Sequence, residues 1–348
     1  MRALVMRGPD DYGVEKVPVP KPGFQEVLVR MRAVALCGSD PPLLEGKSRK
    51  DGLPACLPFI PGHEGAGIVA ETGPGAEMFR PGDPVAAEAH LGCGWCQNCR
   101  EGRYNLCLNF GRQETGHKQY GFTVQGCYAE YCVFHIRSVH RIPEGLSCEQ
   151  GALADTLATA LHGIRLAGVI PGGTAAVMGC GPVGMSASLL LKAMGSRVII
   201  CGRGDRLRKA ALLGADEVIE YPSCDVGKAV KALTDGLGAD RVIECAGTEQ
   251  SFRNSIASVK RGGTVAVIAM PAEDLCSLDL KAVVWNELTI VGSRGNPNCH
   301  EEVLRMMAAG LIDPRPMITH RFPLEQMREA VRTFHERLDG SMKILIQF

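Results

Sequence analysis

The chain has 348 residues, which is enough for about two domains. Its 38 Lys and Arg balance its 38 Asp and Glu, and without a basic surplus we expect no nucleic acid and no anionic membrane as a partner. Hydrophobic residues make up 45% and charged residues 22% of the chain, which excludes a largely disordered protein.

The cysteines indicate a reducing compartment. There are 15 of them, and an odd number makes a poor disulfide framework for a long chain. The sequence opens without the apolar core of a secretory signal, and no uncharged apolar run reaches the roughly 18 residues that span a membrane. We therefore expect a cytoplasmic protein whose reduced thiols are available to bind metal.

The first part of the chain is predicted to be rich in β-strands. Val27–Ala35 and Gly65–Gly73 are short, apolar and bounded by turn residues. The segment Leu91–Asn109 is loop-like and rich in cysteine. The character of the sequence changes near Gly151, where this part gives way to the next.

From Thr174 onward, apolar strands alternate with helices. The predicted strands are 174–179, 197–201, 216–221, 241–247, 264–270 and 287–293. The predicted helices are 182–195, 205–213, 226–233 and 251–259. Continuous apolar strands that alternate with helices are typical of a parallel sheet covered on both faces, so we expect an α/β, doubly wound fold.

The first of these strands runs into a glycine-rich turn. It matches G-x-G-x-x-G through Gly179, Cys180, Gly181, Pro182, Val183 and Gly184. Between a strand and a helix this motif is typical of dinucleotide binding, because its glycines permit a tight turn, approach of the pyrophosphate and close helix packing. Free N–H groups at the helix N-terminus attract the phosphates. The alternative is a glycine turn that binds nothing, and the surrounding strand and helix segments argue against it.

The end of the second strand indicates which dinucleotide is bound. A grip on the ribose 2′-hydroxyl of NAD needs an acid there. This strand ends Ile200-Cys201-Gly202-Arg203, and Asp205 lies further on, within the next helix. A small residue followed by an arginine leaves room and positive charge for a 2′-phosphate. The pattern favours NADP(H) over NAD(H), with a solvated surface charge as the alternative role for Arg203.

Four cysteines in the loop form a candidate metal site. They are Cys93, Cys96, Cys99 and Cys107. Four thiolates in a short loop bind one tetrahedral zinc at about 2.3 Å per bond and leave no open position, so we expect a structural metal. An iron–sulfur cluster and free thiols are the alternatives, although free thiols this close together are prone to oxidation.

A second set of candidate ligands mixes three chemistries. Cys37 follows the end of a predicted strand, and His63 and Glu64 precede another. They supply a thiolate, an imidazole and a carboxylate, which suit the first coordination shell of zinc. Each residue alone would be read as structural, and the set gains meaning from what it resembles.

Taken in order, these motifs resemble those of the zinc-containing medium-chain alcohol dehydrogenase family. The matching segments are Cys-Gly-Ser-Asp at 37–40, Gly-His-Glu-x2-Gly at 62–67, the four-cysteine loop and the glycine motif. The resemblance covers the whole chain. Segments 126–131 and 319–324 look closest to the polyol, sugar and threonine dehydrogenases.

The resemblance implies two domains with different tasks. Residues 1–154 and 296–348 would form a β-rich, GroES-like catalytic domain, and residues 155–295 a Rossmann dinucleotide-binding domain. It also implies one catalytic and one structural zinc per chain, and a homodimer or homotetramer. The implied reaction is reversible oxidation of an alcohol to a carbonyl, with zinc as Lewis acid and nicotinamide as hydride carrier.

The resemblance also assigns the catalytic metal ligands. Cys37 and His63 would bind the zinc, and Glu64 would approach or bind it as coordination changes. Asp155 stands at the position of the third protein ligand. A helix N-cap is the alternative role for Asp155.

Three further residues match positions beside the substrate and cofactor. Ser39 matches the hydroxyl that takes the alcohol proton, with a turn cap as its alternative. The family often continues this relay through a histidine where this chain has Pro42, so the proton must leave by water, Asp40 or the cofactor ribose. Thr159 matches a position beside the nicotinamide and Lys343 one at the pyrophosphate, with ordinary helix surface and a solvated lysine as alternatives.

The expected substrate is a small molecule. Asn109–Gln125 is polar and is expected near the pocket mouth, where His117, Lys118 and Gln119 are candidates for binding hydroxyl or acid groups, unless the loop is simply solvated. This favours a polyol, sugar or cyclitol-like secondary alcohol. The runner-up is an amino-acid alcohol such as threonine. A zinc-free reductase or a non-catalytic relative is the alternative of another class.

Overall fold

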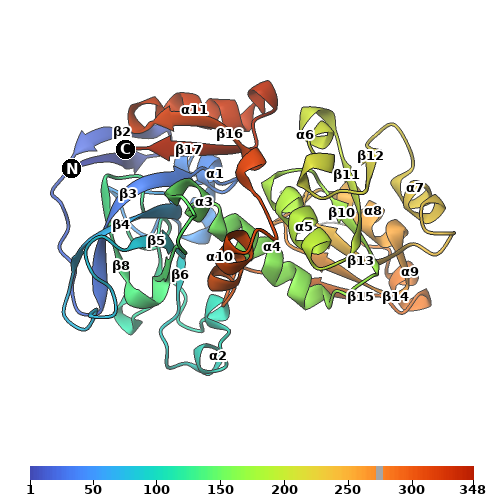
Figure 1. Ribbon diagram of the computed structural model, residues 1–348, viewed down its shortest axis with the longest axis horizontal. Helices are drawn as coiled ribbons and strands as arrows, with labels where there is room; N and C mark the ends of the chain where they lie inside the picture. Colours follow the sequence, from blue (N-terminus) through green and yellow to red (C-terminus); the bar gives the residue numbers. More distant parts are fainter. Residues whose placement is uncertain (272–276) are drawn as a thin grey trace. The chain divides into compact units, whose positions relative to one another are not determined.

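A computed structural model describes residues 1–271 and 277–348. The chain forms two compact units (Figure 1): the first comprises Met1–Asp155, His300–Ala308 and Ile318–Phe348, and the second Thr156–Cys299 and Ala309–Met317. Helix α4 (Ala154–Ala167) begins in the first unit and continues in the second. Within the described ranges, no helix combines the length and apolar character that crossing a membrane requires.

The first unit is built mainly from β-strands. The principal sheet has the order β16 (Ile318–Pro323), β17 (Lys343–Gln347), β3 (Glu26–Ala35), β4 (Glu64–Thr72), β5 (Pro84–Ala87) and β9 (Val139–Arg141), and β8 (Tyr131–His135) also pairs with β3. Two small sheets pair β1 (Arg2–Gly8) with β2 (Asp11–Lys16) and β6 (His90–Leu91) with β7 (Lys118–Gln119). Large buried side chains such as Phe59, Tyr128 and Phe134 fill the core. The prediction of a β-rich, GroES-like domain is confirmed.

Short helices complete the first unit. They are α1 (Asp40–Leu44), α2 (Gln97–Arg100), α3 (Cys148–Gly151), α10 (His300–Ala308) and α11 (Met327–His335). Single 3₁₀ turns lie at Lys47–Asp51, Tyr104–Leu106, Gln113–Thr115, Ile136–Ser138, Leu324–Gln326 and Leu338–Gly340.

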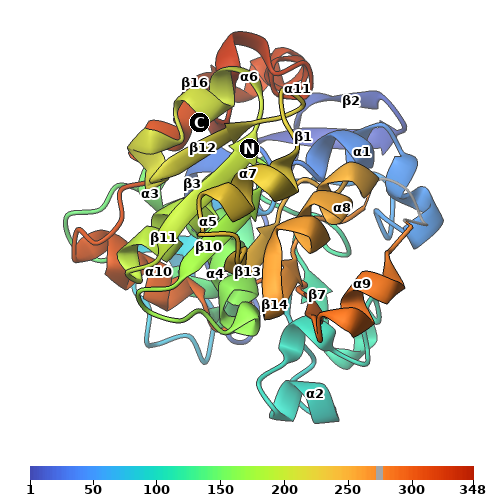
Figure 2. The same ribbon diagram turned by 90° about the vertical axis from the view of Figure 1, so that its right-hand side faces the viewer.

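The second unit is a parallel sheet with helices. Its strand order is β12 (Glu217–Glu220), β11 (Arg197–Gly202), β10 (Thr174–Met178), β13 (Ala239–Glu244), β14 (Val259–Val267) and β15 (Thr289–Gly292). Its helices are α5 (Pro182–Ala193), α6 (Gly204–Arg208), α7 (Val226–Ala232), α8 (Glu249–Ser258) and α9 (Leu280–Trp285), with 3₁₀ turns at Ala211–Leu213 and Arg315–Met317. Helix α5 packs on β10 and β11, whereas α8 packs on β13 and β14 (Figure 2).

The strand order of the second unit locates its ligand-binding edge. The chain order runs outward from β10 in one direction and then from β13 in the other, as in a doubly wound dinucleotide fold. Ligands of such sheets bind at the carboxyl ends of the strands, where the order reverses. The glycine motif follows β10 at that point. The predicted α/β, doubly wound fold is confirmed.

One predicted helix is broken in the structure. The segment 205–213 contains α6 and a separate 3₁₀ turn in place of one continuous helix. Leu207, Ala210 and Leu213 are all buried. A spacing of three residues matches the 3₁₀ period of about 3.0 residues per turn better than the α-helical period of about 3.6. The same spacing also places side chains on one face of an α-helix, so burial is compatible with either conformation and the break is a feature of the fold that the helical pattern does not predict.

Candidate functional site

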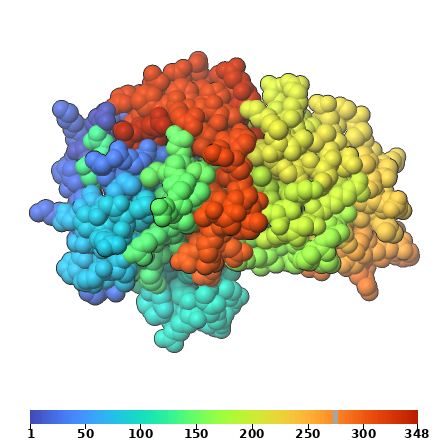
Figure 3. Space-filling view, in the orientation of Figure 1, coloured from blue at the N-terminus to red at the C-terminus, as the bar shows by residue number. Residues whose placement is uncertain are grey.

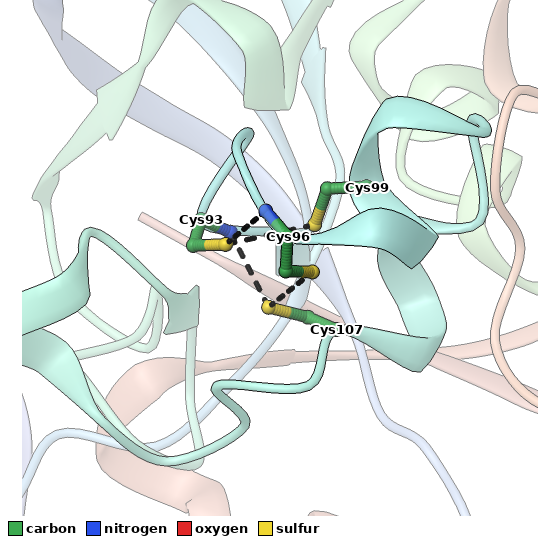
Figure 4. A group of neighbouring side chains, drawn as sticks. All are labelled: Cys93, Cys96, Cys99 and Cys107. Carbon is green, nitrogen blue, oxygen red and sulfur yellow. Dashed lines mark hydrogen bonds between the residues drawn. The ribbon is translucent and has the colours of Figure 1, made fainter.

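The four-cysteine loop forms a compact cluster of sulfur atoms. The four Sγ atoms lie within 4.8 Å of one another (Figure 4). Cys93 and Cys99 have their Sγ atoms 3.9 Å apart, and Cys96 and Cys107 have theirs 4.0 Å apart. A tetrahedral zinc with bonds of about 2.3 Å needs sulfur separations of about 3.8 Å. The sulfur positions thus fit one zinc with four protein ligands.

Backbone and amide donors lower the pKa of Cys93, whereas burial raises the pKa of Cys99 and of Cys107. The Cys93 Sγ accepts from the Cys96 N–H and from the Asn109 side-chain amide, each at 3.4 Å. Burial alone would raise the pKa of Cys93, but these donors outweigh it and lower the pKa to about 6. The Cys107 Sγ accepts from the backbone N–H groups of Cys93 and Asn109, also at 3.4 Å. The lobe around these residues projects from the surface of the first unit (turquoise, at the bottom of Figure 3).

Pairing of two strands brings the mixed-donor set together. Cys37 lies two residues after β3 and His63 directly precedes β4, and these antiparallel strands pair Ala35 with Glu64. As a result, one ligand atom each of Cys37, His63 and Glu64 lies within 4.8 Å of the others. His63 and Glu64 are buried. Sulfur, nitrogen and oxygen donors in this arrangement fit zinc.

A second layer of contacts fixes these candidate ligands. Asp40 is fully buried, and its Oδ2 accepts from the Cys37 N–H at 2.8 Å and from the Tyr128 hydroxyl at 2.7 Å. Its Oδ1 lies 3.6 Å from Nδ1 of His63. A carboxylate behind a histidine ligand fixes the orientation of the ring. The sequence places Asp40 in the motif, but only the fold reveals this contact.

The site is electrostatically suited to a cation. Burial alone would lower the pKa of His63, but the charges of Cys37, Asp40 and Asp155 outweigh it and raise the pKa to about 10. Burial also opposes protonation of Lys343, yet Glu64 and Cys37 raise the pKa of this ammonium group. An imidazole that holds a proton this strongly marks an excess of negative charge, which a divalent metal would neutralise.

Asp155 and Ser39 lie close to this set. Asp155 is buried in the first turn of α4, one residue after the helix begins, so it is not the N-cap. It does not complete the 4.8 Å set of the other three donors, although its charge acts on His63. Ser39 stands at the N-cap of α1 but makes no capping hydrogen bond. Among the described residues its buried Oγ has no hydrogen-bond partner.

The glycine motif has the close approaches that its residues imply. A Cβ on Gly184 would lie 1.9 Å from the carbonyl oxygen of Gly179, so helix α5 packs here only because the residue is glycine. Gly179 has φ +109°, a conformation that side chains disfavour. A Cβ on Gly181 would meet nothing within 4 Å. Pro182 and Val183 begin α5. The turn therefore leaves open space before the helix N-terminus, which fits a pyrophosphate.

The end of β11 has no room for an acidic side chain. A Cβ on Gly202 would lie 2.3 Å from Sγ of Cys180. Arg203 follows as an exposed residue, and within the described ranges its guanidinium has no ion-pair partner. Asp205 is engaged with Arg208. Elsewhere in the second unit, Thr159 Oγ1 accepts from the Asn296 side chain at 3.3 Å.

Other polar candidates already have partners in the first unit. Lys343 is buried, with its ammonium group ion-paired with Glu64 and donating to the carbonyl of Leu36 at 3.3 Å. Lys118 forms an ion pair with Glu26. His117 is buried, and its Nδ1 accepts from the Gly111 N–H at 3.3 Å. Burial of His117 contradicts the expectation that this residue is solvated, and the binding of substrate groups by His117, Lys118 and Gln119 stays a prediction.

Comparison with known proteins extends over the whole chain. Residues 23–144 match the alcohol dehydrogenase GroES-like domain, and residues 182–309 match the zinc-binding dehydrogenase model. Sorbitol dehydrogenase of Bacillus subtilis (strain 168) is 32% identical over 99% of this chain and 97% of its own length. L-threonine 3-dehydrogenase of Bacillus licheniformis is 31% identical over 99% of both chains.

A solved structure shares the same fold. A putative zinc-binding dehydrogenase from Sinorhizobium meliloti 1021, bound to NADP, superposes with a TM-score of 0.90 and 29% identity, over 100% of this chain and 99% of that one. With these relatives, the chain belongs to the zinc-containing medium-chain alcohol dehydrogenase family, in its polyol dehydrogenase-like branch.

Proposed function

We propose that this chain is a zinc-dependent dehydrogenase that transfers a hydride between NADP(H) and a secondary alcohol or ketone of the polyol, sugar or cyclitol-like class. The observation that carries the proposal is the buried convergence of Cys37, His63 and Glu64 beside the charge of Asp155. When bound, zinc would polarise the substrate oxygen and the nicotinamide would carry the hydride.

The side chains around this site have distinct tasks. Cys37, His63 and Asp155 are the proposed metal ligands, and Glu64 would approach or bind the ion as its coordination changes, which leaves one position for the substrate oxygen. Asp40 orients the ring of His63. Ser39 takes the proton of the substrate hydroxyl. Asp40 is buried, its Oδ2 already accepts two hydrogen bonds and its Oδ1 faces His63 at 3.6 Å, so we propose that the proton leaves by water or the cofactor ribose.

The four cysteines Cys93, Cys96, Cys99 and Cys107 are proposed to hold a second, structural zinc. Their sulfur separations support four protein ligands on one ion, with no position left for a substrate. This ion would tie the lobe together and take no part in the reaction.

The preference for NADP(H) is supported by the end of β11. Cys180 blocks the position from which an acid would bind a ribose 2′-hydroxyl, and Arg203, which forms no ion pair with the described residues, offers a positive charge to a 2′-phosphate. The neighbour from Sinorhizobium meliloti 1021 was solved with NADP. Gly179, Gly181, Pro182, Val183 and Gly184 would surround the pyrophosphate, and Thr159 would lie beside the nicotinamide. Lys343 is a further proposed contact, which it could make only by releasing Glu64.

The substrate class rests on the relatives and on the chemistry of the metal set. Relatives of comparable identity are named as sorbitol and L-threonine dehydrogenases, so threonine is the second candidate. A substrate panel of polyols, sugars, cyclitols and threonine, run with NADP⁺ and with NAD⁺, separates them. We expect turnover of a polyol or cyclitol with NADP⁺. Turnover of threonine alone, or a tenfold preference for NAD⁺, would overturn the corresponding part of the proposal.

We propose a homodimer or homotetramer for the assembly, and the cytoplasm as its compartment. Strand β15 forms one edge of the six-stranded sheet, and the neighbouring α9 exposes Leu280 (65%), Val284 (77%) and Trp285 (74%). An exposed sheet edge beside apolar side chains favours association. Light scattering of the wild type and of Trp285→Glu tests this proposal.

The proposed domain bounds are residues 1–154 with 296–348 for the catalytic domain and residues 155–295 for the dinucleotide-binding domain.

A further inference from the structure

A second buried cluster of ionisable groups lies in the first unit, and none of the roles above uses it. Glu88 follows β5, His140 lies in β9 and His300 begins α10. One ligand-type atom of each lies within 4.8 Å of the others. Glu88 and His300 are 1% and 0% exposed, so a structural reason is needed for keeping two such groups away from water.

The histidine of α10 lies between two carboxylates. Nδ1 of His300 is 3.5 Å from Glu88 Oε2, and Nε2 on the other side of the ring is 3.6 Å from Asp155 Oδ1. In the described part of the chain, neither nitrogen has another polar partner. Nε2 of His140 lies 2.9 Å from the same Glu88 oxygen. The four side chains thus form a continuous series of contacts that runs from Asp155 through His300 and Glu88 to His140.

The ring geometry argues against a third metal ion in this cluster. The rings of His140 and His300 are stacked, with centroids 4.9 Å apart and an interplanar angle of 11°. A metal binds an imidazole in the plane of its ring, and two stacked, nearly parallel planes do not share such a point. The same stacking is well suited to holding the two rings still while each faces Glu88.

We propose that His300 is a positioning residue for Asp155, with Glu88 and His140 fixing the orientation of the His300 ring. This inference rests on the proposed function, in which Asp155 is a ligand of the catalytic zinc. Carboxylate ligands are themselves held by hydrogen bonds from a second layer, and loss of such a partner typically costs about 10–100-fold in metal affinity or activity. The corresponding contacts in this site are charged pairs: Asp40 Oδ1 lies 3.6 Å from His63 Nδ1, Lys343 pairs with Glu64, and His300 Nε2 lies 3.6 Å from Asp155 Oδ1, close enough to become a hydrogen bond when Asp155 binds the ion.

The test is the rate at which the holoenzyme loses each zinc to a soluble chelator. For His300→Leu we expect about tenfold to 100-fold faster loss of the zinc bound by Cys37 and His63, while the four-cysteine zinc leaves at the wild-type rate. His300→Gln retains one amide donor, so its rate of release of the catalytic zinc should lie between those of the wild type and His300→Leu. His135→Leu, which removes a half-buried histidine of β8 outside this chain of contacts, is the matched control and should release both ions as the wild type does.

A spectroscopic measurement separates positioning from folding. Replacement of the catalytic zinc by cobalt should give His300→Leu an altered visible absorption spectrum, because the geometry of the Asp155 ligand changes. Unchanged release of this metal and an unchanged cobalt spectrum in folded His300→Leu would overturn the inference. Equal acceleration of both zinc releases would show a purely structural role and would also overturn it.

The experiment also distinguishes this inference from the proposed function. Cys37→Ala should lose the catalytic zinc outright. If Cys37→Ala keeps the same metal content as the wild type, the proposed function itself fails. If Cys37→Ala loses one zinc and His300→Leu behaves as the wild type, only the positioning role fails. If His300→Leu does not fold, the release of each zinc can be compared in the same way between the wild type and the variants His300→Gln and Glu88→Gln.

Discussion

The two candidate metal centres of the first unit are built on opposite principles. The four-cysteine centre draws all its donors from 15 consecutive positions, 93–107, and surrounds its sulfurs with N–H groups. The mixed-donor centre gathers Cys37, His63 and Glu64 from two paired strands and surrounds them with buried carboxylates and one ammonium group. The first arrangement would enclose an ion with four protein ligands, whereas the second offers three donors and would leave a position for a substrate.

The two centres also differ in the contacts that each needs from the rest of the first unit. N–H donors stabilise thiolates within the lobe itself, so that centre needs little from the rest of the unit. The buried charges of Asp40, Glu64 and Lys343 each need a partner from a distant segment, since an unpaired buried charge is strongly destabilising. Function in the second centre is therefore tied to long-range contacts, and function and stability should respond differently to mutation in the two centres.

The largest expected effect comes from one ligand in each centre. His63→Ala should lower kcat/KM by about 10³-fold or more, because several kcal/mol of stabilisation of the substrate oxygen are lost, while the unfolding midpoint changes little. Cys96→Ala should lower the free energy of unfolding by more than about 3 kcal/mol, because the lobe loses its ion. Steady-state kinetics and denaturant unfolding measure both. The proposed difference between a structural and a catalytic centre would be contradicted if Cys96→Ala were as stable as the wild type, or if His63→Ala retained its activity.

The buried ion pair of Glu64 and Lys343 gives the next effect. Lys343→Met should destabilise the protein by about 3–5 kcal/mol, because the Glu64 carboxylate would be left buried without its partner. The double variant Lys343→Met/Glu64→Leu should recover much of this loss, since it removes both charges. Denaturant unfolding of the two variants checks the pair. Equal destabilisation in the single and the double variant would show that Lys343 acts through packing alone.

The nucleotide site tests specificity outside both centres. Gly202→Asp should weaken NADPH binding by at least about tenfold through charge repulsion, and should gain little NADH binding, because its Cβ meets Cys180. Adding Cys180→Ala removes that obstacle, and the double variant should bind NADH more tightly than Gly202→Asp alone. Dissociation constants from nicotinamide fluorescence measure this. Tight NADH binding by the single variant would mean that Cys180 does not restrict the position.

The smallest effect concerns a histidine near neither centre. Burial, together with the charges of Arg137 and Lys118, lowers the pKa of His135 to about 4. Folded His135 thus stays neutral where the unfolded chain takes up a proton, below its ordinary pKa of about 6.5. The contribution of His135 to the free energy of unfolding is therefore largest above that pH and decreases as the pH drops toward 4. Because the residue is only half-buried and solvent screens its charge, we expect the decrease to be about 1 kcal/mol. Unfolding of His135→Gln at pH 7 and pH 5 should show a smaller pH dependence than the wild type, and an equal dependence in both proteins would contradict this account.

Local patterns account for what the sequence predicted. The cysteine spacing, the G-x-G-x-x-G turn and the alternation of strands with helices each lie within a short segment, so the doubly wound fold and the four-sulfur cluster were accessible. The partners of Asp40, Glu64 and Asp155 were not, because Tyr128, Lys343 and His300 reach the site from distant parts of the chain. The split of the predicted helix 205–213 into α6 and a 3₁₀ turn was also not predicted, because the spacing of its apolar residues fits both conformations. No local signal in one sequence reports such contacts.

The most direct test of the account is the zinc content of three proteins. The wild type should contain two zinc ions per chain, Cys37→Ala should be folded and inactive with one, and Cys93→Ala should lose the ion of the four-cysteine lobe. A wild type with a single ion that survives in Cys37→Ala and disappears in Cys93→Ala would contradict the existence of the catalytic centre.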